Sequence, residues 1–437
     1  MCFGSRRRQL APVWHNGPMP IEAFSAAALR RVLVIKLRHH GDVLLAAPVI
    51  SMLKRIAPHC DVDALVYADT APMLEGHPAL AQLHLIDRNW KRHGVVRQAA
   101  AEWKLISALR ARRYDLVLHL SVHTRGAWLV RLLRPRWSVA PRFRAGFWAN
   151  SFTHLYPAQS HPQRHTVDAN LDSLRVLGLE PTPADMRVTM VPGAKADARV
   201  GELLAQHGLP PGGFVHVHPA SRWAFKCWPA ERVAALCDAL AGQGWPLVLT
   251  SAPEAREKAL IAEVRAARDS SAASPKGTSC GASPAPARCV PAGTVDLSGQ
   301  LSLKELAALT ARARLFVGVD SAPMHIAAAM GTPVVAIFGP SGDREWGPWG
   351  ELGKDLHRVV ASKTHPCRPC GMAGCNDSKI SDCLVTLPVA QVLAACEELL
   401  ATIPPAPFAR KGVTMVRRDA APVDVAPALG RPGGGTA

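Results

Sequence analysis

One acidic side chain closes a short polar loop near the start of the chain. Asp42 ends the sequence Arg-His-His-Gly-Asp, which begins at Arg38 and follows an apolar run at 31–36. Gly41 allows the backbone to turn tightly, and a carboxylate at the start of the next helix can take a proton from a bound hydroxyl group. An aspartate in this place can equally be an ordinary helix N-cap, so the loop alone leaves both roles open.

A second loop gathers cations and a hydroxyl group at the start of another helix. Ser221, Arg222 and Lys226 lie in the loop that leaves a predicted strand at 214–218, and Pro229 marks the first turn of the helix that follows. Backbone N–H groups and the helix dipole favour anions there, so these side chains would suit a diphosphate. A surface loop with two ordinary cations is the alternative.

The third loop is a run of small residues that begins at Gly318 with the sequence Gly-Val-Asp-Ser-Ala-Pro-Met-His. Asp320 ends a predicted strand, and the small residues after it let backbone amides approach a phosphate or a sugar closely. Ser321, Met324 and His325 belong to the same run. One Asp-Ser pair would be weak evidence, but the whole run predicts a ligand site.

These three loops require strands that end at a common edge. In the first half, apolar runs at 31–36, 62–67, 83–86 and 116–120 alternate with helical segments such as 43–56 and 96–110. The second half repeats the pattern with predicted strands at 214–218, 246–250, 315–319 and 333–338. Such alternation is typical of doubly wound α/β domains, in which ligands sit beyond the carboxyl ends of the strands. We therefore expect two Rossmann-like halves that face each other across a cleft.

The length of 437 residues suits two domains, and stretches rich in proline, glycine, serine and alanine predict their boundaries. The predicted segments are an N-terminal extension at 1–29, a first α/β domain at 30–180, an inter-domain connection at 181–213, a second α/β domain at 214–407 with a flexible insertion at 269–294, and a disordered tail at 408–437.

The positive charge of the chain is concentrated in its first half. The formal net charge is +17, and residues 1–178 hold 25 Lys and Arg against 11 Asp and Glu, a balance of +14. This half is expected to meet an anion, which would be a phosphorylated substrate, an anionic membrane surface or a nucleic acid. The arginine run at 131–144, which contains Arg134, Arg136 and Arg142, is the strongest candidate, and solvated helix faces are the alternative.

Taken together and in this order, the three loops resemble those of the ADP-heptose:lipopolysaccharide heptosyltransferases, glycosyltransferase family 9. The resemblance covers about residues 30–400, and the sequence Lys-Leu-Arg-His-His-Gly-Asp at 36–42, with a later cysteine cluster, is most similar to the heptosyltransferase III branch. It implies an α/β fold of the GT-B type, with ADP-heptose bound by the second half and the inner core of lipopolysaccharide by the first.

The resemblance also implies roles for particular residues. Asp42 matches the general base, Lys226 the cation on the diphosphate and Asp320 the carboxylate that contacts the donor heptose. The expected donor-binding residues are Ser221, Arg222, Lys226, Glu254, Glu257, Asp320, Ser321, Met324 and His325, with either Glu254 or Glu257 on the nucleoside. The expected acceptor-binding residues are Arg38, His39, His40, Arg134, Arg136 and Arg142. One base and a direct displacement predict inversion at the sugar carbon.

None of the three loops contains an Asp-x-Asp motif, so we expect Lys226 and a helix dipole to take the place of a divalent ion, with no cofactor besides the donor substrate. A later cluster contains Cys367, Cys370, Cys375 and Cys383. Its Cys-x2-Cys spacing suits a structural zinc site, although we favour a packed or redox-labile loop without metal.

The expected location is the cytoplasm, on the inner face of the inner membrane, because no signal-peptide core or membrane-spanning run accompanies the basic half. Rival hypotheses are another nucleotide-sugar enzyme of GT-B fold, such as an epimerase, and a non-catalytic anion-binding protein. An epimerase has no need of a basic acceptor half, and a protein without catalysis would not need Asp42, Lys226 and Asp320 together. Nucleic acid is disfavoured as a partner, although the arginine run is accompanied by the aromatic residues Phe143, Phe147 and Trp148.

Overall fold

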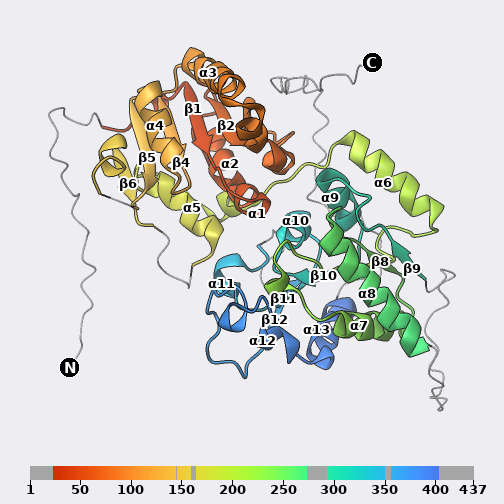
Figure 1. The fold of residues 1–437 in the computed structure, drawn as a ribbon. Helices are drawn as coiled ribbons and strands as arrows, with labels where there is room; N and C mark the ends of the chain where they lie inside the picture. Colours follow the sequence, from red (N-terminus) through yellow and green to blue (C-terminus); the bar gives the residue numbers. More distant parts are fainter. Residues whose placement is uncertain (1–22, 144, 159–163, 273–292, 350–355, 403–437) are drawn as a thin grey trace, which may run out of the picture.

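The computed structural model describes residues 23–143, 145–158, 164–272, 293–349 and 356–402, and these form two α/β halves, each built on a parallel sheet of six strands (Figure 1). In spatial order, the first sheet contains β3 (Gln82–Ile86), β2 (Asp61–Tyr67), β1 (Arg31–Ile35), β4 (Leu116–His119), β5 (Trp137–Pro141) and β6 (His154–Tyr156). The second contains β12 (His357–Ala361), β11 (Val334–Phe338), β10 (Leu315–Val319), β7 (Val215–His218), β8 (Leu247–Leu249) and β9 (Thr294–Asp296).

Both sheets have the Rossmann strand order, which places a topological switch point at the centre of each. In the first sheet β1 lies between β2 and β4, and in the second β7 lies between β8 and β10. The connection reverses direction at these central strands, and ligands of open α/β sheets bind beyond their carboxyl ends. The loops after β1, β7 and β10 are the three that the sequence singled out.

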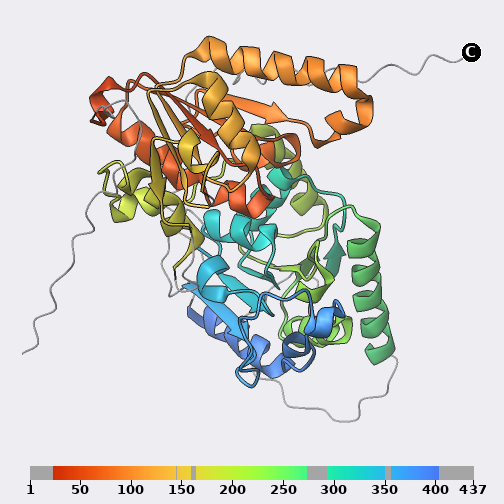
Figure 2. The same ribbon diagram turned by 60° about the vertical axis from the view of Figure 1, so that its left-hand side comes forward.

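Helices cover both sheets (Figures 1 and 2). Those of the first half are α1 (His40–Leu44), α2 (Ala47–Ile56), α3 (Val95–Arg112), α4 (Thr124–Leu133) and α5 (Thr166–Arg175). Those of the second half are α6 (Ala194–Gln206), α7 (Ala230–Gly242), α8 (Ala255–Ala272), α9 (Leu303–Ala311), α10 (Ala322–Ala329), α11 (Asp343–Trp346), α12 (Asp382–Val385) and α13 (Val389–Thr402). No helix in the described part of the chain is long and apolar enough to span a membrane.

Several predicted segments lie partly or wholly outside the described residues, which exclude 1–22, 273–292 and 403–437. Within the described part of the predicted extension, Leu29 is buried and the Phe24 ring packs edge-on against Trp137, with centroids 5.2 Å apart. The predicted connection at 181–213 contains α6. Val200 and Leu204 of this helix are buried in one cluster with Phe214, so α6 packs against the second half.

The two halves share an apolar contact region. Leu306 of α9 and Ile326 and Met330 of the α10 segment belong to the same buried cluster as the core around α2. Polar contacts continue the junction, since Lys304 Nζ donates to the carbonyl of Glu75 at 2.6 Å and the Trp349 indole N–H donates to the carbonyl of Met186 at 2.8 Å. These contacts hold the carboxyl edges of the two sheets against each other.

Candidate functional site

A short ion pair marks the carboxyl edge of the second sheet. Lys226 Nζ donates to Asp320 Oδ2 at 2.6 Å, although 94 positions separate the two residues in the sequence. Lys226 ends a 3-10 turn, Ala224–Lys226, in the loop after β7, and Asp320 directly follows β10, the neighbour of β7. Asp320 is buried, while the Lys226 side chain keeps 22% of its surface exposed. The pair therefore presents a partly open cation at the switch point of the second sheet.

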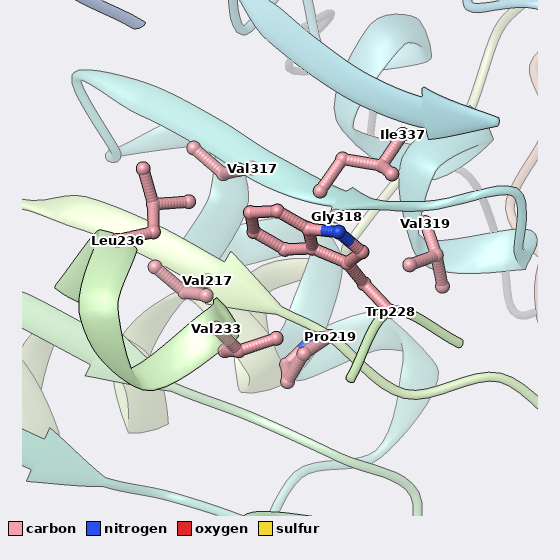
Figure 3. Close-up of a pocket in the computed structure, with 9 residues that line it drawn as sticks. All are labelled: Val217, Pro219, Trp228, Val233, Leu236, Val317, Gly318, Val319 and Ile337. Carbon is pink, nitrogen blue, oxygen red and sulfur yellow. The ribbon is translucent and has the colours of Figure 1, made fainter. Parts of the chain in front are cut away.

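The loop that carries Lys226 is anchored by the buried side chain of Trp228. Its indole lies among Val217 of β7, Val317 and Val319 of β10 and Ile337 of β11 (Figure 3). The indole N–H also donates to the carbonyl of Leu387 at 3.3 Å. The gap left beside it holds only about 10 Å³, which is enough for one water molecule at most. The Trp228 side chain therefore anchors the loop, and the gap beside it is too small to bind a substrate.

Other residues that the sequence predicts for the donor site lie in the same two segments as the ion pair. Ser221 is buried and Arg222 is exposed. Ser321 is the N-cap residue of α10, and Met324 and His325 are buried in its first two turns. The backbone N–H of Met324 donates to the carbonyl of Ser321 at 3.2 Å. The start of α10 thus lies next to Asp320, where its dipole is favourable to an anion.

Asp42 lies in the first turn of α1, at the carboxyl end of β1. His39 is the N-cap residue of this helix, so capping does not account for Asp42. The Arg38 guanidinium Nε is 3.5 Å from Asp42 Oδ1. The Asp42 carboxylate is partly exposed, and among the described residues it forms an ion pair with exposed Arg38, which leaves the carboxylate able to meet a hydroxyl group from outside.

Gly41 and His325 bring the first and second halves into contact. A Cβ atom on Gly41 would come within 2.9 Å of His325 Cδ2, so only glycine fits here without a shift of the imidazole. His325 Nδ1 is buried and has no hydrogen-bond partner among the described residues. Burial lowers the pKa of His325 to about 4, while the carboxylates of Asp320 and Asp42 act in the opposite direction. Asp42 and Asp320 therefore flank one neutral imidazole from the two sides of the junction.

The structure adds two residues that the sequence analysis missed. Glu345 of α11 has a pKa raised by burial, and the charges of Asp320 and Asp42 raise it further. Lys36 is buried, and its Nζ donates to the carbonyl of Leu120 at 2.9 Å and to Asn170 Oδ1 at 3.0 Å. Burial lowers the pKa of Lys36 to about 8, and the charge of Asp42 opposes this shift. Their sequence signals were an acidic residue after the Gly-Pro-Ser-Gly loop and a lysine at the end of an apolar strand.

The two candidate nucleoside-binding acids differ in environment. Glu257 is buried, its Oε2 accepts the backbone N–H of Ala252 at 2.9 Å, and burial raises its pKa. Glu254 is exposed in the segment just before α8. Because one oxygen of Glu257 already accepts a bond within the loop, Glu254 is the more accessible acid for a ligand.

The expected acceptor-binding residues do not lie in one place. Arg38 and His39 are exposed beside Asp42, and His40 Nε2 is 2.9 Å from the carbonyl oxygen of Asp69. Arg134 and Arg136 precede β5, whereas Arg142 follows it. A five-residue strand spans about 16 Å, so Arg142 lies at the edge that holds Asp42 and the other two arginines lie at the opposite edge.

The segment that carries the cysteine cluster contacts the loops around Lys226 and Gly339. Cys367 and Cys370 are exposed, Cys375 is partly buried and Cys383 is buried, and all four are free thiols. Within the described residues, no group of three or more His, Cys, Asp or Glu side chains is arranged to hold a metal ion. In the same segment Ser381 Oγ donates to the carbonyl of Phe225 at 2.7 Å, and Arg368 Nε donates to the carbonyl of Gly339 at 2.5 Å.

With this geometry established, comparison with known proteins identifies the family. Residues 102–380 match the family model described as glycosyltransferase family 9 (heptosyltransferase). The chain belongs to this family. It is 33% identical over 371 residues to lipopolysaccharide heptosyltransferase 3 of Escherichia coli, a match that covers 83% of this chain and 97% of that protein. The predicted family membership, its resemblance to the heptosyltransferase III branch and its glycosyltransferase class are confirmed.

Solved structures of the family have the same fold. A family 9 glycosyltransferase from Veillonella parvula superposes with a TM-score of 0.67 at 20% identity, over 86% of this chain and 99% of that one. The E. coli ADP-heptose lipopolysaccharide heptosyltransferase II gives a TM-score of 0.62 at 18% identity, over 85% and 98%. The GT-B fold predicted from the sequence is confirmed.

Proposed function

We propose that this glycosyltransferase moves a heptose from ADP-heptose to the inner core of lipopolysaccharide, with inversion at the transferred carbon. The observation that carries the proposal is the meeting of Asp42 with the Lys226–Asp320 pair across the Gly41–His325 contact. The substrates are those named for the similar proteins, which include a lipopolysaccharide heptosyltransferase 3 and an ADP-heptose-dependent heptosyltransferase II.

The second half would bind the donor. Lys226 and the start of α10 face the diphosphate, Asp320 contacts the heptose, and Ser221, Arg222 and Ser321 complete the surroundings. The leaving ADP gains negative charge in the transition state, which a preorganised ammonium group and helix dipole stabilise without rearrangement. We therefore propose that no divalent metal or other cofactor is required. Glu254, the more accessible of the two acids, would contact the nucleoside.

The first half would supply the base and hold the acceptor. The Asp42 carboxylate takes the proton of the acceptor hydroxyl group. At the same time the acceptor oxygen bonds to the anomeric carbon of the heptose, and the bond from that carbon to the diphosphate breaks. Because the oxygen enters on the face opposite ADP, the configuration at that carbon inverts. Neutral His325 would separate the two carboxylates without adding a positive charge.

The exposed arginines suggest how the enzyme reaches its acceptor. We propose that Arg38, His39, His40 and Arg142 meet the anionic groups of the inner core at the edge that holds Asp42. Arg134 and Arg136, at the opposite edge, would instead contact an anionic membrane surface, where each exposed cation contributes about 1 kcal/mol. The enzyme would then act in the cytoplasm, as a peripheral protein on the inner face of the inner membrane.

The test is an incubation of the full chain with ADP-heptose and truncated lipopolysaccharide acceptors, followed by mass analysis of the acceptor. The expected result is the addition of one heptose, with the reverse configuration at the new linkage by NMR. Consumption of ADP-heptose with no change in any acceptor would favour another nucleotide-sugar reaction. No consumption of the donor would favour a binding protein.

A further inference from the structure

A second, much larger cavity lies in the first half, beside the Asp42 loop. Its volume is about 520 Å³, within the usual range of sites for small molecules. It is formed between α3 and α4 and the 3-10 segment Arg88–His93 that follows β3. None of the residues expected to bind donor or acceptor lines it.

The charged groups of this cavity are balanced. Asp87 and Glu102 line it together with Arg88 and Arg125. Arg125 forms an ion pair with Glu102, and Arg88 Nε is 3.4 Å from Asp69 Oδ1. His123, whose Nδ1 accepts the backbone N–H of Arg125, also lines the cavity. An added anion would meet two carboxylates here, so the cavity is not built as a phosphate site.

Aromatic rings form part of the walls. Tyr67, Trp90 and Trp128 line the cavity. Trp128 is 59% exposed, and its ring centroid is 4.7 Å from that of Phe147 outside the cavity. The Arg88 guanidinium lies over the Tyr67 ring at 4.0 Å. Such rings offer flat apolar faces between polar groups.

Arg88 links the cavity to the Asp42 loop. Its Nη2 donates to the carbonyl of Arg38 at 3.0 Å, and Arg38 in turn contacts Asp42. A molecule that places a hydroxyl group at Asp42 could therefore extend past Arg88 into the cavity.

We propose that this cavity binds uncharged sugar units of the acceptor, next to the sugar that receives the heptose. The proposal rests on the proposed function. Sugar rings pack their C–H faces on aromatic side chains, and their hydroxyl groups donate to carboxylates and accept from guanidinium groups. An acyl chain would instead remove the charged groups from water without replacing their hydrogen bonds, which is costly. The cavity would thus select acceptors by the sugars that flank the reacting one.

The test compares the wild-type enzyme with Trp128→Ala and, as a matched control, Trp103→Ala. Both tryptophans are exposed, but Trp103 of α3 does not line the cavity. Each enzyme is given two dephosphorylated, lipid-free core oligosaccharides, one with the sugars that flank the acceptor heptose and one without them. In Trp128→Ala, the ratio of kcat/KM for the longer to the shorter acceptor should fall about tenfold, while Trp103→Ala keeps the wild-type ratio.

An unchanged ratio in Trp128→Ala would overturn the proposal. So would a fall of this ratio in Trp128→Ala that appears only when both acceptors are phosphorylated, because the cavity would then serve an anion. These outcomes differ from a failure of the proposed function, in which the wild-type enzyme transfers no heptose to either acceptor.

Discussion

The position of the Lys226 side chain is fixed by its ion pair with Asp320. Its ammonium group is held by buried Asp320 yet remains partly open. We expect Lys226→Ala to weaken ADP-heptose binding and to lower turnover, each by about tenfold or more, because this cation would meet phosphate charge in both the ground and transition states. Calorimetry with ADP-heptose measures the first effect, and exposed Lys195→Ala is the control. Donor affinity equal to that of the wild type would remove Lys226 from the diphosphate site.

At the same scale, residue type and pattern were enough to predict that Asp42, Lys226 and Asp320 lie in the loops after β1, β7 and β10, while their roles stay predictions. How deeply each side chain is buried could not be predicted from the sequence. Glu345 and Lys36 were missed because they stand out only by pKa values that burial and the nearby charge of Asp42 shift. This burial depends on segments that are far away in the sequence. The sequence predicts one patch of arginines at 131–144 because they are neighbours in the chain, but β5 passes through the run and separates Arg134 and Arg136 from Arg142.

The loops that carry these residues depend on other elements for their position. Ser381, just before α12, is buried and donates to the carbonyl of Phe225, the neighbour of Lys226. We expect Ser381→Ala to raise the KM for ADP-heptose about three- to tenfold with little change in kcat, since one buried hydrogen bond is lost and the loop is less well held. Ser378→Ala, an exposed change in the same segment, should leave this KM unchanged. Equal KM values in the two variants would show that the cysteine segment does not position Lys226.

Long, strongly patterned elements were predictable, whereas short edge elements were not. The predicted helix at 96–110 corresponds to α3, and the predicted strand at 315–319 is β10. The strands β6 and β9 have three residues each and include polar residues, whereas the equally short β8 lies in a continuous apolar run and is predicted. The single predicted helix at 43–56 is divided in the structure, since α1 ends at Leu44 and α2 begins at Ala47.

For the molecule as a whole, buried histidines should make stability depend on pH. Burial lowers the pKa of His77, His165 and His325 to about 4 and that of His119 and His218 to about 3. The unfolded chain has ordinary histidine pKa values near 6.5, so it binds more protons than the folded chain below that pH. Stability is therefore complete above pH 6.5 and is lost as the pH falls from 6.5 toward 4.

At pH 5.5 we expect the free energy of unfolding to fall by about 1 kcal/mol for each of these histidines, and by several kcal/mol in total. Urea unfolding at pH 7.5, 6.5 and 5.5 measures it. A free energy of unfolding that stays constant between pH 7.5 and pH 5.5 would show that these imidazoles are protonated in the folded protein.

In the proposed mechanism Asp42 has a role that neither half could give it alone, because the first half would supply the carboxylate and the second would supply the donor site. The most direct test is heptose transfer by Asp42→Asn, with Glu202→Gln on exposed α6 as the control. We predict that turnover falls by about 10²–10⁴-fold while ADP-heptose affinity and thermal stability stay near those of the wild type. Near wild-type turnover in Asp42→Asn would contradict it, since Asp42 would then have no part in removing the acceptor proton.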